Sequence, residues 1–440
     1  MHTSAILTID RGALLQHFRR VRQASIEMCC SLHPEDLRVQ PMEDVSPPWW
    51  NLGHTSWFFA RNALAAFGGE VAPEDAAYDY TLNSYYASLG PRLPRSRRGS
   101  ISRPTTEEIY RYRQSVDRRV EALIETVDED RLADLEFVVR IGIEHEQQHQ
   151  ELFYTEIKCI LAGNPPNLRQ PYRARPNEPV RPRTLGEPCF VAFDGGLFEF
   201  GHREEGWCWD NELPVHEFFL HPFLLQDRLV TTAEYQEFLA DGGYRQQLLW
   251  LDNGWARVQQ EGWQSPLYWE RRDGEWSIWT LAGLRPLAAD EPVCHVSFYE
   301  ADAFARWASQ TFASCRKARL PSEREWEHAA RQLQTEPSGD AFLESSRLHP
   351  SPLRGSEPLA QMAGILWQWT TSYYEPYPGY EPFPGALAEY NGKFMDNQRV
   401  LRGGSCVTPR DHFRVSYRNF WPAPTRFQFT GFRLARDAEN

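Results

Sequence analysis

Two histidines spaced four residues apart are the side chains best suited to chemistry in this sequence of 440 residues. His145 and His149 lie in a segment with a helical pattern, and residues four apart on an α-helix project within about 40° of each other. Both imidazoles can therefore bind one metal ion. Gln148 lies about 60° from His145 and can face the same space, whereas Glu151 lies about 200° from His149 and is poorly placed to reach the ion.

His54 is the candidate for a third ligand. It lies centrally in an apolar segment, between Leu52 and Trp57, that a neighbouring helix would carry. Three neutral imidazoles that leave coordination positions open suit zinc, iron, nickel or copper. The pattern also fits an alternative without a metal, in which the histidines belong to a polar helix face among Glu and Gln in contact with water. Spacing alone leaves both interpretations open.

Four long helices are predicted to position these histidines, because apolar residues recur at helix-like intervals. Asp10 suits the N-cap of the first helix, and a threonine of the Thr105-Thr106 pair, followed by acidic residues, suits that of the third. Gly163 begins a strong terminator after the fourth. The helices are expected over residues 10–26, 49–67, 104–127 and 130–161. They predict a helical bundle with a long crossover from 68 to 104, and long ordered loops of this kind often carry function.

Composition limits the class of protein. Hydrophobic residues make up 41% of the chain, and the aromatic share of 13% excludes a disordered chain. The 47 basic and 60 acidic side chains give a net charge of −13, which argues against a general binder of nucleic acid or anionic membranes. No apolar run suits a transmembrane helix, and the N-terminus lacks a secretory pattern. The eight scattered cysteines, with no CxxC pair, are expected to be mostly buried thiols of a cytoplasmic protein.

The chain is expected to divide into a helical domain, a linker rich in Pro and Arg, and a second domain, over 1–163, 164–188 and 189–440. In the second domain short apolar runs alternate with Gly, Trp and turn signals. Helices are predicted there only at 232–240, 298–311 and 322–333. The predicted fold class is therefore multidomain, α followed by α+β.

A series of short motifs links the second half to a known family. In chain order they include Asn211-Glu212-Leu213-Pro214, Arg319-Leu320-Pro321-Ser322-Glu323, Leu401-Arg402-Gly403-Gly404 and Gly431-Phe432-Arg433. Together they resemble the formylglycine-generating-enzyme (sulfatase-modifying factor) family, which implies a C-type-lectin-like α+β core. That family's oxidase chemistry needs a cysteine pair near the C-terminus. Here Cys406 matches one position but Ser416 occupies the other, so we expect this domain to form the wall of a site elsewhere.

The first half resembles DinB-like four-helix bundles, which place three histidines of the bundle core on one metal. Joined in this order, the two halves resemble the iron-dependent sulfoxide synthases of ergothioneine biosynthesis over essentially the whole chain. The resemblance implies that His54, His145 and His149 bind Fe(II). It also implies the cysteine-using subgroup, because Tyr85 and Tyr86 match active-site tyrosines that come from the N-terminal domain in that subgroup.

By this resemblance the substrates are hercynine (Nα-trimethylhistidine), L-cysteine and O2. The product carries a new C–S bond on the imidazole ring and a sulfoxide, and forming both removes the four electrons that O2 takes up. Coordination to iron would deprotonate the thiol. Either Tyr86 or Tyr85 would then donate a proton and restrain off-pathway oxidation of the thiol.

Residues that bind the substrates are also implied. Gln148 is expected to hydrogen-bond the hercynine imidazole, while Asn419 and Phe420 match positions that contact hercynine, where an amide and an aromatic ring suit its carboxylate and its trimethylammonium group. Trp421 stands where some relatives have an Asp that helps to read γ-glutamylcysteine, and this favours free cysteine. The cysteine carboxylate suits an arginine. Arg95 is the first choice, and Arg426 lies close to Asn419 in the sequence.

Three alternatives remain open. The same fold and iron would serve another coupling: γ-glutamylcysteine as the thiol, a selenosugar as in selenoneine synthesis, or histidine with cysteine as in ovothiol synthesis. A non-catalytic lectin-like binding protein would not require the histidines to converge. A metal-dependent thiol transferase, like other DinB-like bundles, would leave the second domain without a role. The sequence does not decide the oligomeric state or which tyrosine lies closer to the iron.

Overall fold

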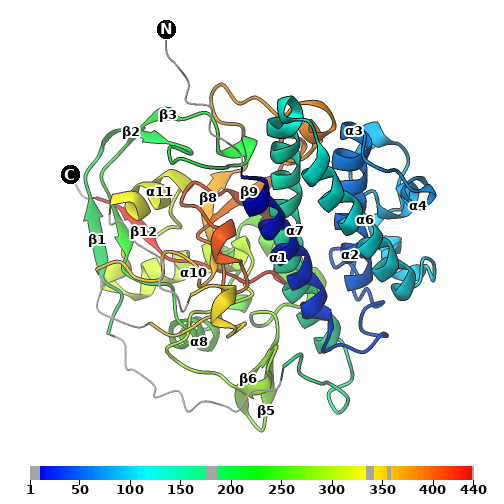
Figure 1. Cartoon of the computed structure of the whole chain (residues 1–440). Helices are drawn as coiled ribbons and strands as arrows, with labels where there is room; N and C mark the ends of the chain where they lie inside the picture. Colours follow the sequence, from blue (N-terminus) through cyan, green and yellow to red (C-terminus); the bar gives the residue numbers. More distant parts are fainter. Residues whose placement is uncertain (1–9, 174–185, 333–340, 354–357, 439–440) are drawn as a thin grey trace. The chain divides into compact units, whose positions relative to one another are not determined.

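The computed structural model describes residues 10–173, 186–332, 341–353 and 358–438, and the chain forms two compact units, Met1–Tyr172 and Arg173–Asn440 (Figure 1). Of the predicted linker over 164–188, residues 174–185 lie outside the described residues. Within the described ranges, no helix has the length and apolar character needed to cross a membrane.

The described part of the first unit is built on the four long helices that the sequence predicts: α1 (Arg11–Cys29), α2 (Pro48–Phe59), α6 (Thr106–Thr126) and α7 (Leu132–Ala162). Helices α1 and α2 each pack against both α6 and α7. Both predicted N-caps are confirmed. The Asp10 carboxylate accepts from the Ala13 N–H at 3.0 Å, and Thr105 forms a reciprocal capping box with Glu108.

Helix α2 continues beyond its last regular turn. A π-helical turn, Ala60–Leu64, leads into the short helix α3 (Ala65–Phe67), and Gly68 ends the run with a φ of +76°. That left-handed conformation suits glycine because it lacks a Cβ. The predicted helix over 49–67 is therefore confirmed, with one wide turn inserted into it.

The crossover between α3 and α6 is organised by short helices: α4 (Pro73–Ala77), α5 (Asp79–Leu82) and the 3-10 turns Ala87–Leu89 and Arg95–Ser100. Buried polar contacts fasten it to the bundle. Arg119 of α6 donates to Asp75 at 2.6 Å, and the Trp57 indole of α2 donates to Asp79 at 2.8 Å. The N-terminal end of α5 is thereby held against α2.

A buried cluster of charge ties the four long helices together. Glu146 of α7 accepts hydrogen bonds from Arg113 of α6 at 2.7 Å, from Arg22 of α1 at 2.8 Å, and from Ser25 of α1. Arg22 also donates to Ser56 of α2 at 2.8 Å. Burial alone would raise the pKa of Glu146, but the two guanidinium groups outweigh burial and lower that pKa to about 2. The ionised carboxylate therefore fixes the rotation of α7 about its own axis.

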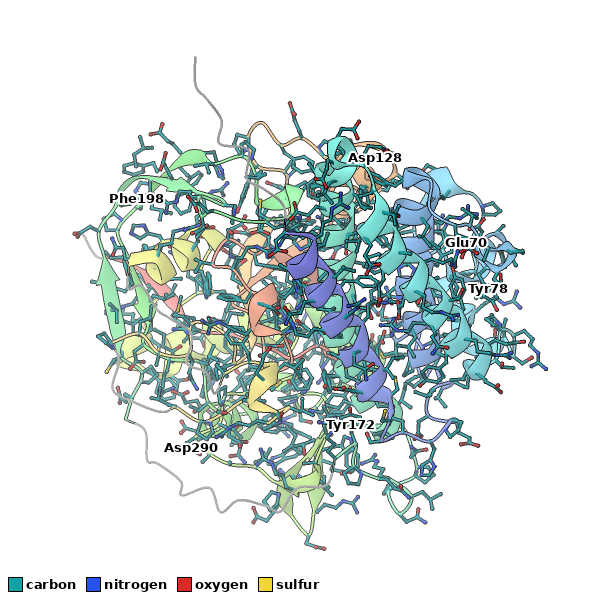
Figure 2. All side chains as sticks on the ribbon, in the orientation of Figure 1. Glu70, Tyr78, Asp128, Tyr172, Phe198 and Asp290 are labelled. Atoms are coloured by element: carbon teal, nitrogen blue, oxygen red, sulfur yellow. The ribbon has the colours of Figure 1, made fainter. Side chains whose placement is uncertain are left out.

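Tyr172 closes the first unit at its C-terminal end (Figure 2). Its hydroxyl donates to the Met28 carbonyl at 2.8 Å, and its ring packs edge-on against Phe153 and Tyr154. The chain that leaves α7 is thus anchored back onto the end of α1.

The described strands of the second unit form small sheets, as expected for an irregular α+β domain. One has the order β1 (Phe190–Phe193), β4 (Phe223–Gln226), β12 (Ala435–Asp437), and another has the order β10 (Asn419–Pro422), β9 (Gln398–Arg402), β8 (Trp367–Tyr373), β11 (Thr430–Gly431). Two further groups are β2 (Gly196–Phe200) with β3 (His216–Leu220), and β5 (Trp269–Arg272), β6 (Glu275–Thr280), β7 (Gly283–Pro286). All these pairings are antiparallel except β8 with β11.

The predicted helices of the second unit are confirmed as α8 (Thr232–Ala240), α10 (Phe298–Thr311) and α11 (Glu323–Gln332). The expectation that there were no others is wrong, because α9 spans Asp252–Glu261. Its apolar pattern is weak, since Gly254 and Val258 are its buried residues. An opening Asp-Asn-Gly sequence also has low helix propensity, so packing against the domain stabilises a helix that local sequence does not favour.

The motifs that characterise the second half hold its core together. Arg402 of β9 donates to Glu327 of α11 at 2.5 Å, and Arg418 donates to Glu323 at 2.9 Å, all four side chains being buried. Gly403 has a φ of +107°, and a Cβ there would lie 2.7 Å from the Met362 carbonyl oxygen. These motif residues therefore act as scaffold.

Candidate metal centre

The three predicted metal ligands converge. His54 comes from α2, and His145 and His149 come from successive turns of α7. One potential ligand atom from each ring lies within 4.8 Å of the other two, and the ring centroids are 4.6–5.0 Å apart. The alternative of a polar helix face in contact with water is wrong for His145, which is buried, as are the neighbouring Glu146 and Gln147.

A hydrogen bond sets the tautomer of His54. The Nδ1 of His54 lies 2.6 Å from the Leu82 carbonyl oxygen, and because a carbonyl only accepts, Nδ1 carries the proton. The Nε2 atom of His54 is buried and has no hydrogen-bond partner among the described residues. A bare, buried imidazole nitrogen facing two more imidazoles fits a metal ligand, since a structural histidine would satisfy that nitrogen.

All three rings are neutral near pH 7. Burial lowers the pKa of His54 and His149 well below the ordinary value, with the neighbouring histidines adding to the effect, and burial lowers the pKa of His145 to about 3. A neutral imidazole is the form that binds a metal. The donor set is therefore uncharged and ready for a divalent ion such as zinc or iron.

Aromatic rings surround the ligands. Trp50 stacks on His54 with a centroid distance of 4.6 Å and an interplanar angle of 13°, and the Arg98 guanidinium lies over the Trp50 ring. Arg98 is itself buried and donates to Ser46 at 2.9 Å and to Ser84 at 3.0 Å. This stack holds the His54 ring in a dry and rigid setting.

The structure places Tyr86 beside the same cluster. Its side chain is buried, and its ring centroid lies 6.0 Å from that of Trp57 and 6.3 Å from that of Phe58. Asn83 fixes the turn, because its amide donates to the Tyr86 carbonyl at 2.9 Å and accepts from the Tyr86 N–H at 3.0 Å. Tyr85 packs against Tyr86 at 4.7 Å and is less buried.

The other predicted residues of the first unit lie on known elements. Gln148 is half-buried on α7, next to His149. Arg95 begins the 3-10 turn Arg95–Ser100, and its guanidinium donates to the Asp44 carbonyl at 2.6 Å.

The predicted residues of the second unit lie on or just after β10. Phe420 stacks on Tyr374 with a centroid distance of 3.9 Å, and the half-buried side chain of Asn419 accepts from the Phe420 N–H. Trp421 packs edge-on against Phe427. Arg426 donates to Glu300 at 3.0 Å, so its charge already has a partner within its own unit.

Sequence reasoning missed two polar residues that are linked to the cluster, one directly and one through the other. The Nδ1 of His149 lies 3.0 Å from Asn51 Oδ1, and Asn51 Nδ2 lies 2.5 Å from Glu156 of α7. Glu156 follows His149 by seven residues, which is two helical turns, so the spacing alone marks it as a residue on the same face.

Comparison with known proteins identifies both parts of the chain. Residues 17–153 match the DinB superfamily, and residues 176–438 match the sulfatase-modifying factor enzyme 1-like domain. The chain is 33% identical over 430 residues to the hercynine oxygenase of Mycolicibacterium thermoresistibile, covering 92% of this chain and 90% of that protein. The chain belongs to the hercynine oxygenase family. A second member, from Mycolicibacterium smegmatis, is 32% identical and covers 98% of this chain and 100% of its own.

Membership of the hercynine oxygenase family makes the chain an oxygen-dependent oxidoreductase. The expected fusion of a DinB-like bundle with a formylglycine-generating-enzyme-like domain is confirmed. The formylglycine-generating enzyme of Streptomyces coelicolor is 28% identical over 322 residues, covering 60% of this chain and 94% of that enzyme. In the present chain, Ser416 donates to the buried Glu212 at 2.6 Å and thus belongs to the scaffold.

Proposed function

We propose that the chain is a non-heme iron(II) sulfoxide synthase that joins hercynine to L-cysteine with O2. The convergence of His54, His145 and His149 in a neutral cluster, with the first two buried and His149 half-buried, carries this proposal. The similarity of the chain to relatives named hercynine oxygenase supports hercynine as the acceptor. The reaction balances as hercynine plus cysteine plus O2 giving the hercynyl-cysteine S-oxide plus water.

Fe(II) held by the three histidines would supply a centre that acidifies a thiol and passes electrons to O2. The protein supplies the environment of that centre. The imidazoles stay neutral because they are buried, and Trp50, Trp57 and Phe58 exclude water around them. A dry site strengthens each electrostatic contact with the substrates and limits loss of reactive oxygen species to solvent.

Tyr86 is the proposed proton donor, with Tyr85 as second choice. The burial of Tyr86 beside rings that touch the histidines, and the hydrogen bonds of Asn83 that fix its backbone, support this order. A phenol held close to the reacting sulfur and oxygen atoms can deliver a proton as O2 is reduced. Delivery at that step favours C–S bond formation over simple oxidation of the thiol.

Substrate contacts are proposed for Gln148 and, from the second unit, for Asn419, Phe420 and Trp421. An amide suits a carboxylate or an imidazole N–H, and aromatic faces suit a trimethylammonium group. For the cysteine carboxylate, Arg95 is preferred over Arg426. The Arg426 guanidinium is already paired with Glu300, whereas the Arg95 guanidinium donates to the main-chain carbonyl of Asp44.

The test is anaerobic reconstitution with Fe(II), followed by O2, hercynine and L-cysteine, with products read by mass spectrometry. The proposal predicts a product of hercynine plus cysteine plus one oxygen less two hydrogens, and its loss in His54→Ala. Parallel reactions replace cysteine with γ-glutamylcysteine or a selenosugar, and hercynine with histidine. A product from one of these alone would move the assignment to that substrate, and O2 uptake without any coupled product would refute the synthase assignment.

A further inference from the structure

His54 and His149 are oriented by different kinds of partner. His54 donates its Nδ1 proton to a main-chain carbonyl, which can only accept. His149 instead faces the side-chain amide of Asn51, at 3.0 Å from Nδ1 to Oδ1. An amide has an accepting end and a donating end, so which nitrogen of His149 carries the proton depends on which end of Asn51 faces the ring.

Glu156 decides the orientation of Asn51. One carboxylate oxygen of Glu156 accepts from Asn51 Nδ2 at 2.5 Å, and the other accepts from the Ser46 N–H at 2.8 Å. Asn51 and Glu156 are both buried. Burial raises the pKa of Glu156 to about 7, and above that pH the ionised carboxylate only accepts, so the NH2 end of Asn51 faces Glu156 and the oxygen end faces His149.

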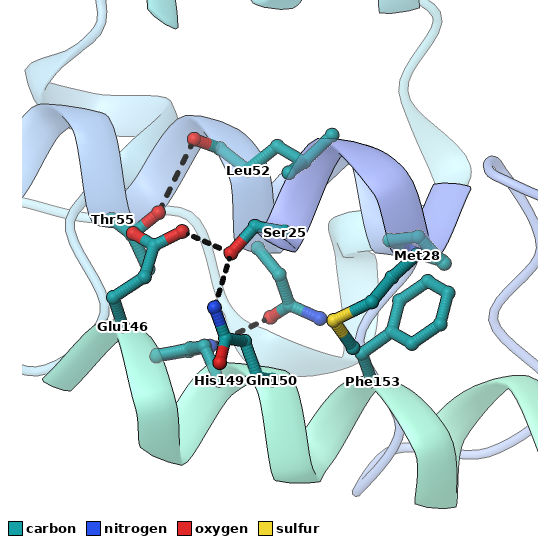
Figure 3. A pocket seen from close by; sticks show the side chains of 10 residues that line it. Ser25, Met28, Leu52, Thr55, Glu146, His149, Gln150 and Phe153 are labelled. Atoms are coloured by element: carbon teal, nitrogen blue, oxygen red, sulfur yellow. Dashed lines mark hydrogen bonds between the residues drawn. The ribbon is translucent and has the colours of Figure 1, made fainter. Parts of the chain in front are cut away.

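Packing alone does not fix this orientation. Asn51 and His149 both border a small pocket between α1, α2 and α7, which Met28 and Phe153 also line (Figure 3). A side chain that faces open space on one side is held by its hydrogen bonds more than by its neighbours. The bonds from Ser46 and Glu156 are therefore the natural determinants of how Asn51 meets His149.

We propose that Glu156 is a positioning residue of the metal site. Acting through Asn51, it selects the tautomer of His149 that has its proton on Nδ1 and a bare Nε2 directed at the metal. The role of His149 as a ligand rests on the proposed function, whereas the control of its tautomer by Glu156 does not. Loss of a partner of this kind typically weakens metal binding by about 10–100-fold.

Glu156→Gln gives a directed test. The Ser46 N–H belongs to the backbone and cannot turn, so the oxygen of the new amide stays on it and the new NH2 group faces Asn51. The Asn51 amide must then turn over and donate to His149 Nδ1, which moves the ring proton to Nε2. We expect ¹⁵N NMR of the metal-free protein labelled at histidine to show that change of tautomer, with the His149 signal assigned by its loss in His149→Ala.

A double variant restores the order of donors and acceptors. In N51D/E156Q the amide at 156 donates to a carboxylate at 51, and that carboxylate accepts from His149 Nδ1. We expect E156Q to weaken Fe(II) binding, measured anaerobically by equilibrium dialysis, by about 10–100-fold and the double variant to recover most of the loss. Glu151→Gln, the same change at another buried glutamate of α7, is the matched control and should bind Fe(II) as the parent does.

The proposal is overturned if E156Q keeps both the parent tautomer and the parent affinity, or if the folded double variant binds Fe(II) no better than E156Q. If E156Q does not fold, Asn51→Leu removes the acceptor that faces His149 Nδ1, and the same NMR measurement shows whether the His149 tautomer changes. The NMR result is independent of catalysis. A tautomer change in E156Q therefore supports Glu156 as a positioning residue even if hercynine and cysteine give no product, and that lack of product counts against the proposed function alone.

Discussion

Glu146→Gln is the substitution with the largest expected effect on the first unit. It keeps the shape of a side chain that is 1% exposed and removes the charge that faces Arg22 and Arg113, at 2.8 Å and 2.7 Å. Arg22 keeps its ion pair with Asp117 at 2.6 Å, whereas leaving the buried Arg113 guanidinium without its carboxylate costs about 3–5 kcal/mol. The pKa of Glu146 gives a similar figure. Lowering that pKa from the ordinary 4.5 to about 2 corresponds to about 3 kcal/mol of stability, at ~1.4 kcal/mol for each pH unit.

The sign of this linkage is fixed by the direction of the pKa. Because the folded state lowers the pKa of Glu146, its stabilising effect is complete above about pH 4.5 and is lost as the pH falls toward 2. At pH 7 the full effect is present in the parent and absent in Glu146→Gln. The substitution should therefore lower the free energy of unfolding of the first unit by about 3 kcal/mol at neutral pH.

The assay is urea unfolding of the metal-free protein, followed by hydrogen exchange in peptides of α1 and α7 so that the first unit is read separately. With a urea m-value of about 1–3 kcal/mol/M, the midpoint should fall by about 1–3 M. Glu136→Gln is the control on the same helix, because Glu136 pairs with Arg140 at 2.8 Å on a far more exposed face. That change should cost no more than about 0.5 kcal/mol. A Glu146→Gln protein as stable as the Glu136→Gln protein would refute the role given to the buried cluster.

Three other substitutions each change one contact. Tyr86→Phe keeps the ring beside Trp57 but removes the hydroxyl, so mass spectrometry should show coupled product reduced about 100-fold or more, Fe(II) binding retained and more cysteine oxidised without coupling. Gly142→Val overpacks α7 against Phe59, since even a Cβ at Gly142 would lie 2.3 Å from that ring, and should cost about 1–3 kcal/mol in a thermal melt. Burial would raise the pKa of Glu212, but the Arg414 guanidinium outweighs burial and lowers it. Melts of the second unit should therefore lose stability as the pH falls below about 4.5, and Glu212→Gln should flatten that dependence.

Each of these has a contrary result. Normal coupling by Tyr86→Phe would leave Tyr85 as the proton donor. A Gly142→Val protein that melts with the parent would mean that the α2–α7 contact has room to adjust. A steep acid transition that persists in Glu212→Gln would assign the loss of stability to other carboxylates.

The sequence predicted the long elements well because their signals are local. The helices that became α1, α2, α6 and α7 show periodic apolar residues with caps, and the spacing of His145 and His149 follows directly from helical geometry. The short α9 was missed because tertiary packing, not its own sequence, stabilises it. The resemblance to a known family supplied what spacing could not, namely that His54 belongs with the other two.

Contacts between segments that are distant in the sequence could not be predicted from the sequence alone. Glu and Gln around His145 are typical of a helix face in water, yet Glu146 and Gln147 are buried because Arg22 and Arg113, more than 30 positions away in sequence, satisfy the charge. Nothing in the sequence around Asn51 marked it as a partner of His149, because that contact depends on the packing of α2 against α7. Among the crossover arginines, only the fold distinguishes Arg98, which stacks on Trp50, from Arg95.

The most direct test of the central claim is an anaerobic Fe(II) titration of the full chain, with bound iron counted per chain. We predict one Fe(II) per chain, and a large loss of affinity when His54, His145 or His149 is changed singly to Ala in a protein that remains folded. A folded parent chain that binds no Fe(II), or one that still binds it fully after His54→Ala, would contradict the three-histidine centre and with it the synthase proposed here.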